Sequence, residues 1–566
     1  MARASRDVEI INPGALAPEF ERCLRELEDG HVVRRIWDRD RTVWKADDQE
    51  ISNRLGWLDA PRTAAGNVPA MEAFAAEVRA DGLTRAVVLG MGGSSLAPDV
   101  FARLFPTAPG SLEIEVLDTT EPGAVAAAAA RFDLRRTLFL VSSKSGSTAE
   151  LVALLSFFYD RTRRGLGEGR CGGHFVAITD PGSPLEGLAG SLRFRGVFHG
   201  RPDIGGRFSA LSAFGLLPAT LKGIDPERLL APARSMAEAC HNGSSSANPG
   251  ALLGAALGAA ARLGRDKLTF VVPPAWDPLA SWLEQLIAES TGKEGRGIVP
   301  VVEPDPGDAG SYGRDRLFVD LPAPPGAPSP PVLRDLVAAG APVIRPFLDE
   351  PYSLGAAFFL WEFATAVAAH VMGINPFDQP DVESTKAKTR QILAASGAGG
   401  PFAADLSSFA GGLRVAGGDK SGSPAAALSL FLDGRRDGDY IALLAFLPNV
   451  PKIEAALAGI AARLRHTTGL PVTLAFGPRY LHSTGQLHKG DGNRGLFLML
   501  VASGLPELGI PKVAGISRPA PDFGSLFGAQ ARGDALALAE KGRRVLTVEM
   551  EPPVEAGIAA LTSLLG

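Results

Sequence analysis

Cysteine is scarce in this chain of 566 residues, and the few cysteines present exclude two kinds of site. Cys23, Cys171 and Cys240 are odd in number and far apart, so the sequence holds neither a disulfide framework nor a CxxC metal motif. Such usage is typical of a reducing compartment. We therefore expect a cytoplasmic protein.

The sequence also lacks an excess of positive charge and a segment suited to a bilayer. Lys and Arg total 57 against 62 Asp and Glu, and this balance does not indicate a nucleic-acid surface. The N-terminus lacks the apolar run of a signal peptide. The most membrane-like run, ALLGAALGAAARLG (251–264), is too short and too rich in Ala and Gly to span a membrane. We expect neither nucleic acid nor a membrane as a partner.

What the sequence does contain is the pattern of a large α/β protein. Its length exceeds one ordinary core, and 46% apolar with 21% charged residues is typical of globular domains. Residues 15–60 have helical spacing. From about residue 83, short apolar strands alternate with helices, which predicts a parallel, doubly wound sheet, and the alternation starts again near residue 248.

The last third of the chain, from about residue 400, resembles the middle. GRDRLFVDL (313–321) is similar to GNRGLFLML (492–500), and each is followed by an apolar or small-residue helix. An internal duplication explains this similarity, and two unrelated strand–loop–helix units explain it nearly as well.

Two Gly- and Ser-rich turns follow predicted strands, at GMGGSS (90–95) and SSKSGST (142–148). A strand that ends in such a turn and opens a helix directs free N–H groups and the positive end of the helix dipole toward one point, which favours an anion. Both turns lie at the carboxyl ends of parallel strands, where ligands bind in open sheets.

The first turn fits several kinds of site unequally. A dinucleotide fingerprint needs glycine where Ser95 stands, and a P-loop needs a GK[ST] sequence that does not follow. A bare structural turn is one interpretation; a small sugar-phosphate site, with Gly92 and Gly93 allowing close backbone approach, is another. The second turn favours the sugar phosphate, because a helix cap needs one hydroxyl and this turn has five.

Five motifs, in order between residues 85 and 390, resemble those of the glucose-6-phosphate isomerase family. They are GMGGSSLAP, SSKSGST, GGRFSALSAFG (205–215), EQLIAESTGK (284–293) and GINPFDQPDVESTK (373–386). The resemblance implies two sugar-isomerase domains, each an αβα sandwich around a doubly wound parallel sheet. It also implies interconversion of glucose 6-phosphate and fructose 6-phosphate through a cis-enediol, in glycolysis and gluconeogenesis, without a cofactor or a metal.

With this resemblance, the chain is expected to divide into four parts. An N-terminal helical segment (1–60) precedes a first sugar-isomerase domain (61–230) with the phosphate loop and a second (231–400) with the Glu and Lys motifs. The stretch LAASGAGGPFAA, near 390–405, is typical of a linker. An additional C-terminal α/β segment (401–566) follows.

Aldose–ketose isomerisation needs a base that moves a proton between adjacent carbons, a cation or donors for the enediolate, and an acid–base pair for ring opening. By match to the family motifs, Glu289 is the candidate base and Arg207 the enediolate stabiliser, while Lys386 and His482 open the ring. The resemblance assigns the phosphate to Ser143, Lys144, Ser145 and Thr148, and the sugar to Gly93 and Ser94.

The histidine lies outside the usual family order. Between the Glu and Lys motifs the only histidine is His370, which lies in an apolar helix and is better explained as a core residue. The segment YLHSTGQLHKG (480–490) comes after both motifs, as in the isomerase portion of bifunctional transaldolase/glucose-6-phosphate isomerases, which the chain resembles most. His482 is carried over from its His-x-x-x-Gln spacing. His488, a polar surface turn and a metal pair compete with this assignment.

The activity and the assembly each allow a second interpretation. The protein could be a dual phosphoglucose/phosphomannose isomerase, or a non-catalytic regulator that binds sugar phosphates. A regulator would lack Glu289, Lys386 and Arg207, so the enzyme is favoured. The resemblance also implies a homodimer with a histidine crossing between subunits, and the displaced histidine puts that crossing in question.

Overall fold

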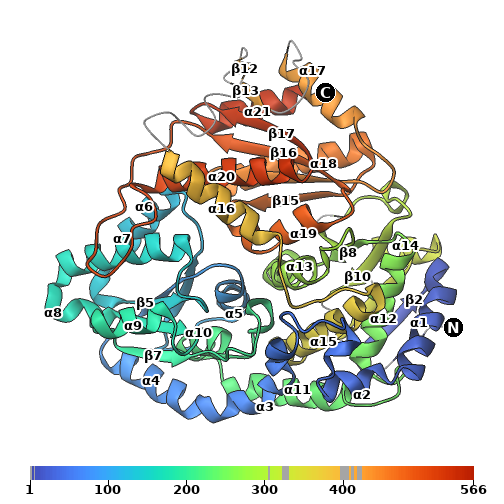
Figure 1. Cartoon of the computed structure of the whole chain (residues 1–566), viewed down its shortest axis with the longest axis horizontal. Coiled ribbons are helices and arrows are strands. Elements are labelled where there is room, and N and C mark those ends of the chain that lie inside the picture. Colours follow the sequence, from blue (N-terminus) through green and yellow to red (C-terminus); the bar gives the residue numbers. More distant parts are fainter. Residues whose placement is uncertain are drawn as a thin grey trace. The chain divides into compact units, whose positions relative to one another are not determined.

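The computed structural model describes residues 3–4, 7–303, 306–321, 330–395, 407–408, 413–416 and 423–565. The chain divides into two compact units, each built of helices layered on mainly parallel sheets (Figure 1). Unit 1 comprises Met1–Leu117, Asp133–Leu151 and Thr162–Gln379. Unit 2 comprises Asp118–Phe132, Val152–Arg161 and Pro380–Gly566.

The first sheet of unit 1 has five parallel strands in the order β4-β3-β5-β6-β7. Every residue of β5 and β6 is buried, as expected for strands that helices cover on both faces. The strands are β3 (Arg85–Leu89), β4 (Glu113–Leu117), β5 (Thr137–Ser142), β6 (Phe175–Thr179) and β7 (Gly196–His199). Helices α4 (Val68–Ala80), α5 (Leu96–Leu104), α7 (Ala149–Leu166), α9 (Pro184–Ser191) and α10 (Ala213–Lys222) belong to the same part of the chain.

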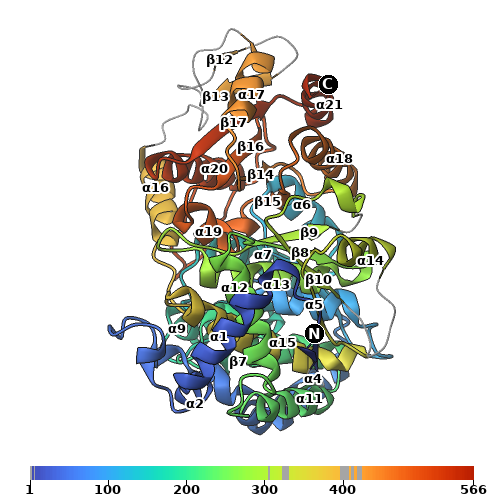
Figure 2. The same ribbon diagram turned by 90° about the vertical axis from the view of Figure 1, so that its right-hand side faces the viewer.

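The second sheet of unit 1 has the order β9-β8-β10-β11-β2-β1, with β1 at Arg3–Ala4. Its strands β8, β9 and β10 are labelled in Figure 2. Its parallel strands are β8 (Lys267–Val271), β9 (Val299–Glu303), β10 (Arg316–Asp320) and β11 (Val343–Pro346). Strand β2 (Val8–Asn12) pairs antiparallel with β11. The first 60 residues, expected to be helical, therefore also supply a strand to this sheet, ahead of helices α1 (Ala17–Asp29) and α2 (Val32–Trp37).

Unit 2 contains a third sheet with the same plan as the second. Its order is β15-β14-β16-β17-β13-β12, with the first four strands parallel and β13 antiparallel to β17. Helix α20 (Phe523–Glu540) connects β16 to β17. The strands are β12 (Ser407–Ser408), β13 (Leu413–Ala416), β14 (Tyr440–Phe446), β15 (Val472–Phe476), β16 (Gly495–Ala502) and β17 (Arg544–Met550).

The repeated strand order bears on the internal duplication. GRDRLFVDL forms β10 and GNRGLFLML forms β16, and both are the third parallel strand along the chain in sheets ordered 2-1-3-4. The helix part of the match was wrong, because α20 lies between the third and fourth strands, whereas α15 (Leu354–Met372) follows the fourth. The first sheet of unit 1 also has the order 2-1-3-4, so this order is typical of the fold class and the duplication stays a prediction.

Two apolar helices, α12 (Pro249–Arg262) and α15, pack together in the core of unit 1. The run 251–264 singled out from the sequence forms α12. A Cβ at Gly254 would come within 2.6 Å of Val367, and one at Gly258 within 2.5 Å of Val371, so the glycines allow this close approach. Residues Pro351–Met372 are long and apolar enough to cross a membrane, but 83% of that window is buried inside the protein, as in the core helix of a globular domain.

The predicted linker falls partly outside the described residues. Of the linker at 390–405, residues 390–395 complete helix α16 (Val382–Ala395) and the rest lie outside.

Candidate functional site

The glycine turn after β3 packs backbone to backbone against a segment that follows β7. Gly92–Ser94 forms one turn of 3-10 helix, with Gly92 at φ 55° and Ser94 buried. A Cβ at Gly93 would overlap the carbonyl group of Gly206, so only glycine permits this approach. The turn expected to touch the sugar therefore lies directly beside the backbone of Arg207.

The hydroxyl-rich loop joins β5 to α7 and leaves the start of that helix without a side-chain cap. Thr148 is the N-cap residue, but its side chain makes no capping hydrogen bond. Ser143 Oγ instead accepts a bond from the Gly146 amide at 3.0 Å and lies 3.4 Å from Thr148 Oγ1. Ser145 and Ser147 are exposed. A long helix with an uncapped N-terminus and hydroxyls around it is suited to bind an anion.

Lys144 is engaged by the protein itself. Its Nζ lies 2.7 Å from Asp180 Oδ1 and donates to the Arg201 carbonyl at 2.9 Å. Burial lowers the pKa of Lys144, and the bond to Asp180 partly offsets this effect. Because Asp180 directly follows β6, Lys144 ties the hydroxyl-rich loop to the neighbouring strand.

Arg207 is the centre of a buried polar network in unit 1. Its side chain is 2% exposed, and each of the five N–H groups of a guanidinium has an acceptor. The acceptors are Ser290 Oγ (2.8 Å), Gln379 Oε1 (2.9 Å), Glu289 Oε1 (2.9 Å) and the carbonyls of Pro376 (2.5 Å) and Asp378 (3.0 Å). Arg207 thus joins the segment beside the glycine turn to the Glu motif and to residues 376–379.

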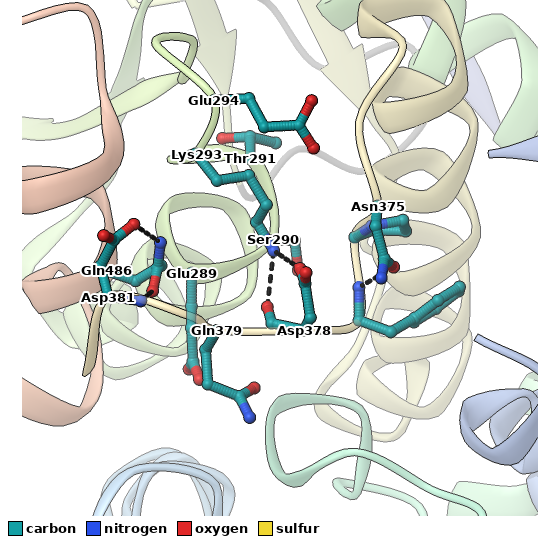
Figure 3. A network of polar contacts seen from close by, with 12 residues as sticks. Glu289, Ser290, Thr291, Lys293, Glu294, Asn375, Asp378, Gln379, Asp381 and Gln486 are labelled. Atoms are coloured by element: carbon teal, nitrogen blue, oxygen red, sulfur yellow. Dashed lines mark hydrogen bonds and ion pairs between the residues drawn. The ribbon is translucent and has the colours of Figure 1, made fainter. Parts of the chain in front are cut away.

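Glu289 lies in the last turn of α13 (Asp277–Thr291), with its carboxylate fixed from two directions. Oε1 pairs with Arg207, and Oε2 accepts a bond from Gln285 Nε2 at 3.1 Å, one helical turn earlier. The side chain retains 14% exposure. The carboxylate is therefore oriented and still within reach of a ligand (Figure 3).

Lys293 and Asp378, to which the motifs assign no role, form a pair in the same network. Lys293 is 1% exposed, and its Nζ donates to Asp378 Oδ1 at 2.7 Å and to the Asp378 carbonyl at 2.5 Å (Figure 3). Burial, assisted by the charge of Arg207, lowers the pKa of Lys293 to about 8. The pair holds the turn whose carbonyls bind Arg207. Both residues stand inside quoted motifs, but only the fold reveals that they meet.

Lys386 belongs to unit 2, in the first turns of α16. Its Nζ is 2.7 Å from Glu383 Oε1, and 46% of the lysine side chain is exposed. This bond lowers the pKa of Glu383. Lys386 is therefore an accessible ammonium group with a partner that solvent also reaches.

The His segment is bonded to the start of the Lys helix. The Asp381 amide donates to Gln486 Oε1 at 2.9 Å, and Gln486 Nε2 donates to Asp381 Oδ2 at 2.8 Å (Figure 3). Gln486 is the last residue of the His-x-x-x-Gln spacing. Unit 2 thus brings the predicted His and Lys motifs together, while unit 1 brings together the glycine turn, Arg207 and Glu289.

The two histidines of the segment have different surroundings. His482, at the end of a 3-10 turn (Arg479–His482), is partly exposed. His488 is 1% exposed and packs among the rings of Tyr440, Tyr480 and Phe497. Burial holds the pKa of His488 well below its usual range. A polar surface turn is therefore wrong for His488, which is a neutral core residue.

The arrangement in unit 1 is chemically that of a carboxylate base beside a fixed cation. Among the residues that the structure describes, no group of three His, Cys, Asp or Glu is placed to hold a metal ion. Cys23, Cys171 and Cys240 are buried, and each is a thiol that is not part of a disulfide.

Comparisons with known proteins point to one family. A family model described as phosphoglucose isomerase matches residues 69–297, which include both turns, Arg207 and Glu289. A glucose-6-phosphate isomerase of Geobacter sp. (strain M21) is 31% identical over 451 residues, covering 70% of this chain and 80% of that protein. One of Rubrobacter xylanophilus is 29% identical, covering 64% and 95%.

Solved structures show the same fold over most of the chain. A hypothetical protein of Thermus thermophilus aligns with a TM-score of 0.57 at 27% identity, covering 70% of this chain and all of that one. A glucose-6-phosphate isomerase of Chlamydia trachomatis aligns with a TM-score of 0.58 at 19% identity, covering 69% and 89%.

Proposed function

The chain belongs to the glucose-6-phosphate isomerase family, and we propose how its residues interconvert glucose 6-phosphate and fructose 6-phosphate. The reaction moves one hydrogen between C1 and C2 through a cis-enediol. The observation that carries the proposal is the Glu289 carboxylate, which two bonds orient beside a buried guanidinium.

Glu289 is the base. It takes the proton from C2 of the open-chain aldose, or from C1 of the ketose, and returns it to the other carbon. The ion pair with Arg207 holds the carboxylate in position for this proton transfer. The partial exposure of Glu289 lets the carboxylate meet a substrate carbon.

Arg207 acts through its fixed charge. All five of its N–H groups have acceptors in the protein, so it orients Glu289 and places positive charge near the developing enediolate without first losing bonds to water. A guanidinium suits this task because it keeps its charge at every working pH.

The hydroxyl-rich loop binds the phosphate. Ser143, Ser145 and Thr148 supply hydroxyls, and the first amides of α7 supply N–H groups. Lys144 contributes by holding the loop through Asp180, and its charge adds to the positive potential. Gly93 and Ser94 contact the sugar.

Lys386 and His482 open the sugar ring, by proton transfer at the ring oxygen and the anomeric hydroxyl. Their shared support is the pair of hydrogen bonds between Asp381 and Gln486, which fixes the two motifs to one another. His482 is favoured over His488 because His488 is buried among aromatic rings.

We further propose that the enzyme is a cytoplasmic homodimer. Three buried cysteines that remain thiols suit a reducing compartment. The dimer is what the family resemblance implies, and light scattering coupled to size-exclusion chromatography measures it directly.

The Glu289→Gln variant tests the proposal. Glutamine has nearly the same shape but cannot accept the proton, so isomerisation should fall by about 10²–10⁴-fold while sugar-phosphate binding survives. In deuterated water the parent enzyme should place deuterium at C2 of the glucose 6-phosphate made from fructose 6-phosphate, and the variant should incorporate almost none.

Glu284→Gln, on the same helix, is the matched control and should behave like the parent. Full activity of Glu289→Gln would show that another residue is the base. Complete retention of the substrate hydrogen by the parent enzyme would indicate a hydride shift instead.

A further inference from the structure

A buried carboxylate in unit 2 receives bonds from both segments that carry the proposed ring-opening residues. Asp534, on α20, is fully buried. Its Oδ2 accepts from Tyr480 Oη at 2.7 Å. Its Oδ1 lies 2.6 Å from Lys489 Nζ and accepts from Thr385 Oγ1 at 3.2 Å.

The first of these segments is the Lys helix, α16, which lies unusually close to α20. A Cβ at Gly533 would come within 2.7 Å of Thr389 Oγ1 and 3.0 Å of the Thr389 amide nitrogen. Glycine at this position therefore lets the helices approach until Thr385 reaches Asp534. Lys386 is the next residue, so fixing Thr385 also fixes the backbone from which Lys386 extends.

The second segment is the His turn, which Asp534 holds from both ends. Tyr480 stands two residues before His482, and Lys489 stands seven residues after it. Lys489 also donates to the Gly485 carbonyl at 3.1 Å, inside the same turn. The Asp534 carboxylate therefore connects the two ends of the His turn and fixes the position of His482 between them.

We propose that Asp534 is a positioning residue that sets the distance between Lys386 and His482. The inference rests on the proposed roles of those two residues in ring opening. Lys489 supplies the charge partner of the buried acid, and two hydroxyls satisfy further acceptor sites of the carboxylate. The two hydroxyls come from two different segments, so the one carboxylate connects the Lys helix with the His turn.

The proposed consequence is geometric. Ring opening requires the acid and the base to reach two oxygens of one sugar, and displacements of about 1 Å can cost roughly 10²-fold in rate. The chemistry at C1 and C2 does not use Lys386 or His482. Loss of the Asp534 contacts should therefore slow ring opening selectively.

Thr385→Val and Tyr480→Phe each remove one hydroxyl and keep the size of the side chain, whereas replacing Asp534 would leave Lys489 buried without its partner. Each variant should lower kcat on fructose 6-phosphate by about tenfold, a usual cost of losing an outer partner of a functional group. KM should change little. On 5-deoxyfructose 6-phosphate, which cannot close the five-membered ring, hydrogen exchange with solvent should stay within about twofold of the parent.

Thr562→Val is the matched control, because the Thr562 hydroxyl donates to a carbonyl of its own helix in unit 2. It should leave both substrates unaffected. Equal losses on both substrates, or a lowered Tm with unchanged kcat, would show that Asp534 serves the fold alone and would overturn the inference.

His482→Asn separates this inference from the proposed function. If His482→Asn leaves turnover of fructose 6-phosphate intact, the proposed role of His482 fails, whatever the other variants do. If it slows turnover but Thr385→Val and Tyr480→Phe do not, only the role of Asp534 fails. Adding Thr385→Val to His482→Asn should slow the cyclic substrate little further, since residues that act as a unit are not additive.

Discussion

The first and second sheets of unit 1 share a strand order but differ in the residues that follow the carboxyl ends of their strands. In the first, the strands β3 and β5 run into Gly- and Ser-rich turns with an uncapped helix behind the second turn. In the second, β8 runs into consecutive prolines, and the acids at the ends of β9 and β10 are paired. Glu303 lies 3.4 Å from Arg316, and Asp320 lies 2.6 Å from Arg345.

The difference shows that strand order alone does not make a binding edge. An edge that binds an anion needs unpaired N–H groups and hydroxyls. In the second sheet, the acids at the ends of β9 and β10 are instead paired with arginines of the same sheet. This sheet contributes to the site through Glu289. Helix α13 leads back from the end of β8 toward the start of β9, so Glu289 lies on the side of the second sheet where its parallel strands begin. There it pairs with Arg207, which follows β7, the last strand of the first sheet.

Among the substitutions that compare the two sheets, the largest expected effect comes from Arg207, where the two halves of unit 1 meet. Arg207→Lys keeps the charge but cannot satisfy five acceptors, so Glu289 loses its orientation. We expect kcat on fructose 6-phosphate to fall by about 10²-fold, the cost of misplacing a catalytic group by about 1 Å. Binding of sorbitol 6-phosphate, which has no carbonyl to isomerise, should stay close to that of the parent.

The same substitution at the closed edge of the second sheet is the control. Arg345→Lys disturbs a buried pair with Asp320 and should lower Tm without a comparable loss of kcat. Similar losses of kcat at both positions would contradict the division of labour between the sheets.

A smaller effect is expected at the open edge of the first sheet. Thr148→Ala removes one hydroxyl that we assign to the phosphate, so the affinity for fructose 6-phosphate should fall by about 1–3 kcal/mol, as for a hydrogen bond to a charged group. Isothermal titration calorimetry with Glu289→Gln as background avoids turnover. Affinity for unphosphorylated fructose should not change.

Thr269→Ala, in the second sheet, is the counterpart. Thr269 accepts a bond from Arg316 inside the protein, so its loss should lower stability and spare affinity. If Thr269→Ala and Thr148→Ala lowered the affinity for fructose 6-phosphate by the same amount, our assignment of the phosphate to the first sheet would be contradicted.

The last substitution replaces an unpaired acid on α15, and we expect it to leave turnover unchanged. Glu362 is completely buried, and neither carboxylate oxygen has a hydrogen-bond partner. Burial raises the pKa of Glu362 well above its usual value. The folded protein therefore holds a proton that the unfolded chain releases above about pH 4.3, and stability must fall as pH rises from there toward the folded-state pKa.

Glu362→Gln should remove this dependence. The difference in unfolding free energy between variant and parent should grow in favour of the variant by up to about 1.4 kcal/mol per pH unit in that window. Chemical denaturation at a series of pH values measures it. A constant difference across the window would show that Glu362 does not titrate with unfolding.

Much of the fold could be predicted from the sequence where burial is uniform. Strands β5 and β6 are buried at every residue, so each appears as an unbroken apolar run. Strand β9 could not be recognised in this way, because VPVVE contains a proline and ends in an acid. Glu303 is buried only because Arg316 and Tyr312 meet it in the fold.

The motifs predict which residues make up the candidate site but not which contacts these residues make. The GGR sequence identifies Arg207, but two of its acceptors are backbone carbonyls 169 and 171 positions later. Every residue has a backbone carbonyl, so the sequence does not indicate which carbonyl accepts the bond. The burial of His488 was equally hidden, since the rings of Tyr440 and Phe497 surround it only in the folded unit.

The packing of α12 against α15 has a consequence for how this protein can be engineered. Gly250, Gly254 and Gly258 are spaced one turn apart, and a Cβ at each would come within about 2.6 Å of side chains on α15. A methyl group at any one of them would separate the helices at all three. In a mutational scan, this stripe should tolerate no substitution, whereas exposed positions of α1 nearby accept many. Libraries meant to alter the substrate range gain by leaving the stripe constant.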